Sequence, residues 1–206
     1  MRYPIILLDN GHGRETAGKC SPDGELQEWK WTREMAIRLR DDLKDRGYNV
    51  FLVTPEDVDV PLALRAKRVN AYCDQYGKEN IILLSIHINA SGDTPEWRKP
   101  HGFSVYTSKG VTDSDVLASC LYDAAATEFP DRRIRKFNND AEPDFEENFY
   151  ILRHTRCPAV LTENFFMDNE SDAEFLQSDQ GRSAILHTHV KGILKYIKAK
   201  YRQPNQ

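Results

Sequence analysis

The stretch IILLDNGHG, residues 5–13, decides the fold class of this chain. The four aliphatic residues that open it predict a short strand buried on both faces, as strands in parallel sheets are. Gly11 and Gly13 then allow the chain to bend sharply with little steric penalty. His12 is therefore expected at the tip of a buried strand, which is where α/β proteins place ligands and catalytic groups.

Strand and helix patterns alternate along the rest of the chain. The segment 28–46 places large apolar residues at helical spacing, and Gly47 is a typical helix stop. The other expected strands are 49–54, 80–90, 102–108, 149–153 and 159–164. The other expected helices are 61–76, 113–129, a short acidic helix after the last strand, and a closing helix at about 182–201. A long polar loop is expected at 132–148. This alternation predicts a single α/β domain over residues 1–206, with a mostly parallel sheet flanked by helices.

The composition excludes several classes of partner. The net charge of −4 and the pI near 5.9 give no general electrostatic footprint for DNA or RNA. The four cysteines are widely separated and form no CxxC pair, so they suggest neither a zinc knuckle nor a disulfide framework. The apolar run near the N-terminus is too short for a signal-peptide core or a membrane span. We therefore expect no nucleic-acid partner, no membrane span and no export signal in this chain.

Three polar side chains stand at the ends of predicted strands: His12, His87 in ILLSIHINA, and Glu163 after AVLT. Because open α/β sheets gather ligands beyond the carboxyl ends of their strands, residues distant in sequence converge there. A fourth group, Glu28, begins the first helix. Two imidazoles and one carboxylate can bind Zn²⁺ in a catalytic site that keeps its fourth position for water. The second carboxylate would then serve as the base.

The order of four motifs resembles a known family. NGHG, a Glu at the start of a helix, SIHINA and TENFFMDN are similar to the zinc-dependent N-acetylmuramoyl-L-alanine amidases of the Amidase_3 type, over residues 5 to about 196. The resemblance implies a twisted sheet between helices, with His12, Glu28 and His87 as zinc ligands and Glu163 as the catalytic carboxylate. It implies an enzyme that uses zinc-activated water to cleave the peptidoglycan amide between N-acetylmuramic acid and L-alanine of the stem peptide.

Several positions leave alternatives open. The family's second motif has Lys after the Glu and Asn four residues after it, and this chain departs from both, so Glu25 remains a rival to Glu28 as ligand. Phe165 stands where the family commonly has Gly, and we expect its larger side chain to narrow the cleft. Asn89, two residues after His87, is a candidate substrate-binding residue or a turn former.

Arg65 fits the family's Leu-x-x-Arg helix motif, and an ion pair to a neighbouring loop is the interpretation we favour. Its motif stands in the helix expected over 61–76.

Two other functions fit the same scaffold. One is a zinc peptidase that acts within the stem peptide, because fold alone does not settle the substrate. The other is a non-catalytic peptidoglycan-binding module. On any of the three interpretations the chain acts at the cell wall or in the periplasm. Without a visible signal, it fits a phage lysin released by a holin, or a bacterial autolysin whose export signal has been removed. The sequence does not predict the oligomeric state.

Overall fold

The computed structural model describes residues 3–93, 95–137 and 143–201. Helices and strands alternate, as the sequence predicts. Their order is β1 (Ile5–Asn10), α1 (Glu28–Asp45), β2 (Val50–Leu52), α2 (Leu62–Tyr76), the 3-10 helix η1 (Lys78–Asn80), β3 (Ile81–Asn89), β4 (Ser104–Thr107), α3 (Asp113–Glu128), β5 (Phe145–Glu146), α4 (Tyr150–His154), β6 (Ala159–Phe166), α5 (Glu170–Gln177) and α6 (Asp179–Lys200). Among the described helices, none is both long enough and apolar enough to cross a membrane.

The six strands form one sheet in the order β2-β1-β3-β6-β4-β5. β1 is parallel to β2 and β3, and β3 is parallel to β6, whereas β4 is antiparallel to β6. The prediction of a mostly parallel sheet is therefore confirmed. The register places Asn10 opposite Ile86 and His87 opposite Glu163. The carboxyl ends of β1, β3 and β6 thus meet at one edge of the sheet.

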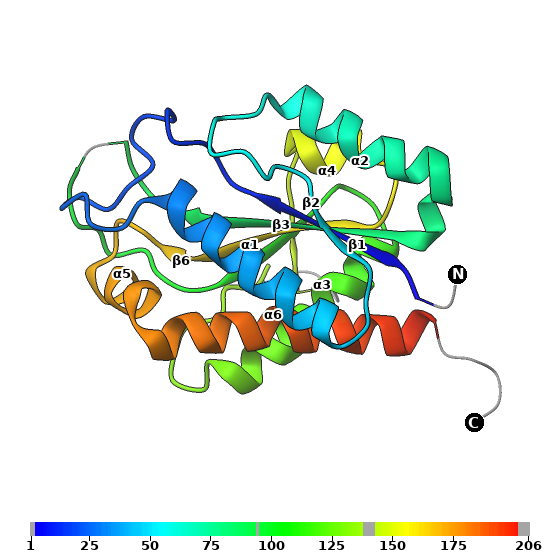
Figure 1. The fold of residues 1–206 in the computed structure, drawn as a ribbon. Coiled ribbons are helices and arrows are strands. Elements are labelled where there is room, and N and C mark those ends of the chain that lie inside the picture. Colours follow the sequence, from blue (N-terminus) through cyan, green and yellow to red (C-terminus); the bar gives the residue numbers. More distant parts are fainter. Residues whose placement is uncertain (1–2, 94, 138–142, 202–206) are drawn as a thin grey trace.

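The sheet has a layer of helices on each face. Helices α1, α3 and α6 cover one face, and α2 and α4 cover the other (Figure 1). Alternate residues of β1 enter the two cores: Ile6 and Leu8 pack toward α1, while Ile5 and Leu7 pack toward α2. The expected burial of this strand on both faces is confirmed.

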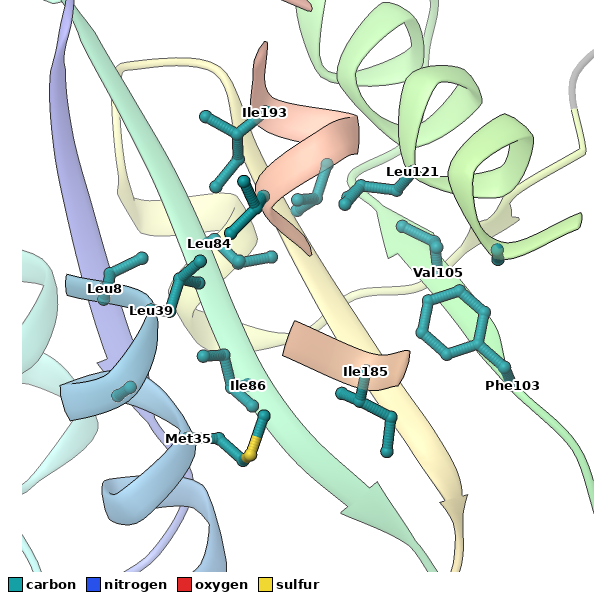
Figure 2. Packing of buried hydrophobic residues seen from close by; sticks show 14 of the residues in the cluster. Leu8, Met35, Leu39, Leu84, Ile86, Phe103, Val105, Leu121, Ile185 and Ile193 are labelled. Atoms are coloured by element: carbon teal, nitrogen blue, oxygen red, sulfur yellow. The ribbon is translucent and has the colours of Figure 1, made fainter. Parts of the chain in front are cut away.

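The larger core lies between the sheet and helices α1, α3 and α6. Figure 2 shows Leu8 and Leu84 from the sheet packed with Leu39 of α1 and Ile193 of α6. Close approach of α6 to α3 requires Gly192, because a Cβ there would lie 2.6 Å from the side chain of Leu121. This core fixes the sheet against three helices and leaves the opposite face for the smaller layer.

The prediction of a strand at 149–153 is wrong. Residues Tyr150–His154 form the short helix α4, in which the amides of Leu152 and Arg153 both donate to the carbonyl of Phe149. Ile151 and Leu152 are both buried and belong to the smaller core. A five-residue apolar run fits either element, so its packing against α2 decides the outcome.

The predicted loop at 132–148 is interrupted by β5, which pairs with β4 through Tyr106 and Thr107. Part of that loop, residues 138–142, lies outside the described residues.

Candidate active site

His12 is held at the end of β1 in the left-handed backbone region, with φ of 57°. The flanking glycines serve close approach: a Cβ on Gly11 would lie 2.5 Å from His87 Nδ1, and one on Gly13 would lie 2.0 Å from the amide nitrogen of Asp59. The bend expected at this motif therefore resides in His12 itself. The glycines leave room for the His87 ring on one side and for the backbone of Val58 and Asp59 on the other.

Glu28 lies between the two histidines. It opens α1, is buried, and its Oε1 accepts a hydrogen bond from the amide of Ile88 at 3.0 Å. The same oxygen lies 3.1 Å from His87 Nδ1, and Oε2 lies 3.4 Å from His12 Nε2. The rival Glu25 is exposed, and its amide donates to Asp23 in a turn. The geometry places Glu28, and not Glu25, beside both imidazoles.

The three donors of His12, Glu28 and His87 form a cluster in which the ligand atoms lie within 4.8 Å of one another. Tetrahedral zinc with bonds of about 2.0–2.1 Å separates its ligands by roughly 3.3 Å, close to both distances from Glu28. Glu28 Oε2 is buried and has no hydrogen-bond partner among the described residues. An orphaned carboxylate oxygen beside two imidazoles fits a divalent cation.

The ionisation of this cluster also suits a metal. Burial lowers the pKa of His12 to about 4, so its imidazole is neutral at pH 7 and able to ligate. Burial alone would raise the pKa of Glu28, but its hydrogen bond with His87 and the charges of both histidines lower it overall. Burial opposes the charged form of His87, and the same bond with Glu28 outweighs it, so the pKa of His87 is raised. Both shifts have the same cause, the contact between Glu28 and His87, which favours the charged form of each.

Glu163 lies across from His87 on the neighbouring strand β6. Its side chain is only partly buried, yet Oε2 is out of contact with solvent and has no partner among the described residues. Desolvation raises the pKa of Glu163 to about 8, with the charge of Glu28 adding to the rise and that of His87 opposing it. A carboxyl group poised near neutrality is suited to accept and return a proton.

A cavity of about 560 Å³ opens over this cluster, between the sheet edge and helices α2 and α4. His12, His87 and Glu163 line its polar side. Its apolar side is lined by Val60, Pro61, Leu62, Phe149, Tyr150, Ile151 and Leu161. The cavity therefore brings one apolar wall to within reach of the proposed metal ligands and the carboxylate.

Arg65 of α2 forms hydrogen bonds with residues at the end of β1. Its guanidinium is buried and donates to Asp9 Oδ1 at 2.9 Å, to the carbonyl of Asn10 at 2.6 Å and to that of His12 at 3.3 Å. It also contacts Asp59, in the loop before α2, at 3.3 Å. The predicted ion pair to a neighbouring loop is confirmed, and the buried partner Asp9 was not predicted.

A bulge follows Glu163, because two residues of β6 stand opposite the single Ile88 between His87 and Asn89. The first, Asn164, is buried and donates from Nδ2 to the carbonyl of His87 at 2.8 Å. The second, Phe165, has φ of 65° and is fully buried against Phe129 and other rings of the larger core. The expectation that Phe165 narrows the cleft is wrong, because the bulge turns its ring away from the cavity.

Asn89 ends β3, where its Oδ1 accepts a hydrogen bond from the amide of Ala90 at 2.8 Å. Its carbonyl accepts from Met167. It is not among the described residues that line the cavity. A role in substrate binding stays a prediction.

Comparison with known proteins identifies the family. A family model described as N-acetylmuramoyl-L-alanine amidase (Amidase_3) matches residues 6–195. The N-acetylmuramoyl-L-alanine amidase CwlM of Bacillus licheniformis is 33% identical over 197 residues, 92% of this chain and 67% of that protein. An endolysin of Bacillus phage SPP1 is 26% identical over 198 residues, 95% of this chain and 67% of its own. This chain thus spans about two thirds of the length of each.

The fold agrees with a solved structure. The crystal structure of an N-acetylmuramoyl-L-alanine amidase from Clostridium difficile 630 superposes with a TM-score of 0.81 at 22% identity, covering 97% of this chain and 99% of that one. At that identity the likeness concerns the fold. Together with the family match over residues 6–195, it means that this chain belongs to the Amidase_3 family of N-acetylmuramoyl-L-alanine amidases, which cleave peptidoglycan.

Proposed function

We propose that this chain is a zinc-dependent hydrolase that cleaves the amide bond between N-acetylmuramic acid and L-alanine of the peptidoglycan stem. His12, Glu28 and His87 would hold the metal, and Glu163 would carry the proton. The observation that supports this most is that two carboxylate oxygens beside the histidines, Glu28 Oε2 and Glu163 Oε2, are buried and accept no hydrogen bond from the described residues. Native structures rarely leave buried carboxylate oxygens unpaired unless a ligand or a reaction uses them.

Bound zinc would supply a Lewis acid that polarises the scissile carbonyl and lowers the pKa of water. Glu163 accepts the proton of the attacking water, because its raised pKa makes it a stronger base than an ordinary carboxylate. It then returns that proton to the departing amine of L-alanine, which is too poor a leaving group as an anion. His12, Glu28 and His87 would hold the metal, the two histidines as neutral imidazoles, and the contacts of Glu28 with both histidines place the three donors together beforehand.

The cavity supports a bulky substrate. Its apolar wall from Val60 to Leu62 and from Phe149 to Ile151 would receive the peptide side of the scissile bond, beside the polar side lined by His12, His87 and Glu163. Asn89 stays a candidate for substrate contact. Residues 1–206 would act as one catalytic domain on peptidoglycan outside the cytoplasm, as either an autolysin or a phage lysin.

Product analysis tests the bond that is cut. Purified sacculi are digested with the full chain, new amino groups are labelled, and released fragments are identified by mass spectrometry. Amidase action exposes mainly the α-amino group of alanine, leaves reducing sugars unchanged, and releases peptides without muramic acid. New amino termini inside the stem would instead favour a peptidase, and binding to sacculi with no release in the presence of zinc would favour a non-catalytic module.

A metal experiment tests the ligand set. Chelation should abolish hydrolysis and Zn²⁺ should restore it, with affinity falling in acid as protons compete for the histidines. His12→Ala and His87→Ala should lose the near-stoichiometric zinc of the native chain. The exposed His101 lies outside the cluster, so His101→Ala is the matched control and should keep its zinc. Full zinc occupancy in both His12→Ala and His87→Ala would show that these histidines are not the zinc ligands.

A further inference from the structure

Arg33 is a buried cation on α1, five residues after the proposed metal ligand Glu28. Only 8% of the residue is exposed. The carboxylate with which it pairs among the described residues, Asp57, is more than half exposed and lies 3.9 Å away. A long pair with an exposed partner does little to offset the burial of a charge. The bonding that keeps Arg33 in place therefore lies elsewhere, in the backbone around it.

The guanidinium of Arg33 joins three segments through hydrogen bonds to carbonyl oxygens. Nη2 donates to the carbonyl of His12 at 2.9 Å. Nη1 donates to the carbonyl of Trp29, in the first turn of α1, at 2.9 Å. Nε donates to the carbonyl of Glu56, in the loop between β2 and α2, at 2.9 Å. Arg33 thus ties the backbone of one proposed ligand to the helix that carries another.

The backbone of His12 needs such support, because its φ of 57° lies in the left-handed region. A residue with a side chain keeps that conformation only where surrounding contacts fix it. The His12 carbonyl accepts from Arg33 and also, at 3.3 Å, from Arg65 of α2. The carbonyl of Gly11 accepts from Thr32 Oγ1 of α1 at 3.1 Å. Rotation of the backbone here would carry the imidazole away from the other two proposed ligands.

We propose that Arg33 is a positioning residue of the metal centre, which holds the backbone of His12 so that its imidazole stays beside Glu28 and His87. This rests on the proposed function, because it takes those three residues as the metal ligands. Arg33 is not among the described residues that line the cavity, and it acts through His12 alone. Groups that orient metal ligands commonly change metal affinity by about 10–100-fold when they are removed.

The zinc affinity of the full chain tests this. Arg33→Met keeps an apolar stem and removes the hydrogen-bond donors, so the dissociation constant for Zn²⁺, measured by competition with a chromophoric chelator, should rise by about 10–100-fold. The visible spectrum of the Co²⁺-loaded chain should also change, because it reports the arrangement of the ligands. A residue that only stabilised the fold would leave both measurements unchanged in a chain that circular dichroism shows to be folded.

Arg68→Met is the matched control. Arg68 lies on α2 and also holds the loop between β2 and α2, through a hydrogen bond to the carbonyl of Val53 at 2.8 Å and an ion pair with Glu56 at 2.5 Å. These described contacts leave the backbone of His12 untouched. The zinc affinity and the Co²⁺ spectrum of Arg68→Met should therefore equal those of the native chain.

Arg33→Lys is the second variant, and it decides the question if Arg33→Met does not fold. Lysine keeps the positive charge but carries it on a single nitrogen. It therefore cannot bond to the carbonyls of His12, Trp29 and Glu56 through three separate nitrogens. We expect its zinc affinity to fall as well, by less than that of Arg33→Met.

Hydrogen exchange in the metal-free chain gives a readout that needs no metal. In the segment that follows His12, the amide of Arg14 donates to the carbonyl of Asp57, and the amide of Thr16 donates to the carbonyl of Gly13. Both amides should exchange faster in the Arg33 variants than in the native chain and in the control, because the segment loses its tie to α1.

Native zinc affinity in a folded Arg33 variant, or unchanged exchange over residues 11–16, would overturn the proposal. A native chain that binds no zinc would instead refute the proposed metal centre. The exchange comparison would then still decide whether Arg33 holds the backbone of His12.

Discussion

Two carboxylates, Asp9 and Glu163, line the same cavity and have opposite surroundings. Asp9 is fully buried, with Oδ1 bonded to Arg65 and Oδ2 accepting from Ser85 at 2.7 Å. Glu163 is half-buried, and its Oε2 has neither solvent nor a described partner. The two carboxylates therefore differ in role. Asp9, whose oxygens are both bonded, holds the β1 tip, whereas Glu163, which lacks such partners, has a raised pKa and can exchange a proton near neutral pH.

The largest effect is expected from Glu163→Gln, which keeps the shape of the side chain and removes its basicity. Hydrolysis of sacculi should fall by about 10²–10⁴-fold, because general acid–base catalysis contributes roughly that much. Zinc content should stay that of the native chain, because Glu163 lies outside the three-donor cluster. Activity near the native level, or loss of the metal along with activity, would contradict the division between base and ligands.

The next effect concerns stability and comes from Arg65→Met, which leaves Asp9 charged, buried and without its main partner. Breaking a buried pair from one side costs about 3–5 kcal/mol, and we expect a loss of that size in the free energy of unfolding by denaturant. The double variant Asp9→Asn, Arg65→Met should recover part of it, since no buried charge remains. If the free energy of unfolding of Arg65→Met lies within about 0.5 kcal/mol of that of the native chain, the pair of Arg65 and Asp9 contributes little to stability.

A third prediction uses the pH dependence of stability in the metal-free protein. The pKa of Glu163 is about 8 when folded and near its ordinary value of 4.5 when unfolded, so the folded state binds its proton more tightly. The stability from that proton is fully present below about pH 4.5 and is lost as the pH rises toward 8. Glu163→Gln has no such proton to lose.

Chemical unfolding of both metal-free proteins between pH 5 and pH 8 measures this difference. The stability of Glu163→Gln relative to the native chain should grow over that range by on the order of 3 kcal/mol. The pair of Glu28 and His87 is present in both proteins, and because the charge of Glu163 helps to raise the pKa of His87, part of the difference reflects that coupling. If the stabilities of the two proteins change in parallel with pH, then burial does not raise the pKa of Glu163.

The sequence predicts the placement of His12, His87 and Glu163 well, for a physical reason. Each follows a run of aliphatic residues, and such runs are strands buried on both faces whose carboxyl ends meet at one edge. Glu28 was harder to predict, because Glu25 stands just before the helix and Glu28 is its first residue, and only the fold shows which of the two reaches the histidines.

Other features depend on contacts between distant residues and carry no local signal. The bulge after Glu163 is fixed by Asn164 bonding to the His87 carbonyl and by Phe165 entering an aromatic core. A side chain at a position where glycine is common therefore points away from the cleft. The helix α4 was missed for a related reason, since its five residues are too few for their periodicity to distinguish helix from strand.

The smallest effect is expected from Glu25→Gln, and it tests the ligand assignment most closely. Glu25 and Glu28 are three residues apart, but only Glu28 is buried beside both imidazoles, while Glu25 is exposed in a turn. Glu25→Gln should therefore keep its zinc and lie within about 0.5 kcal/mol of native stability. Glu28→Gln is the matched substitution and should weaken zinc binding, because a neutral amide is a poorer ligand than a carboxylate. Zinc lost from the first variant and kept in the second would reverse the assignment, and the two buried oxygens without partners would then need another explanation.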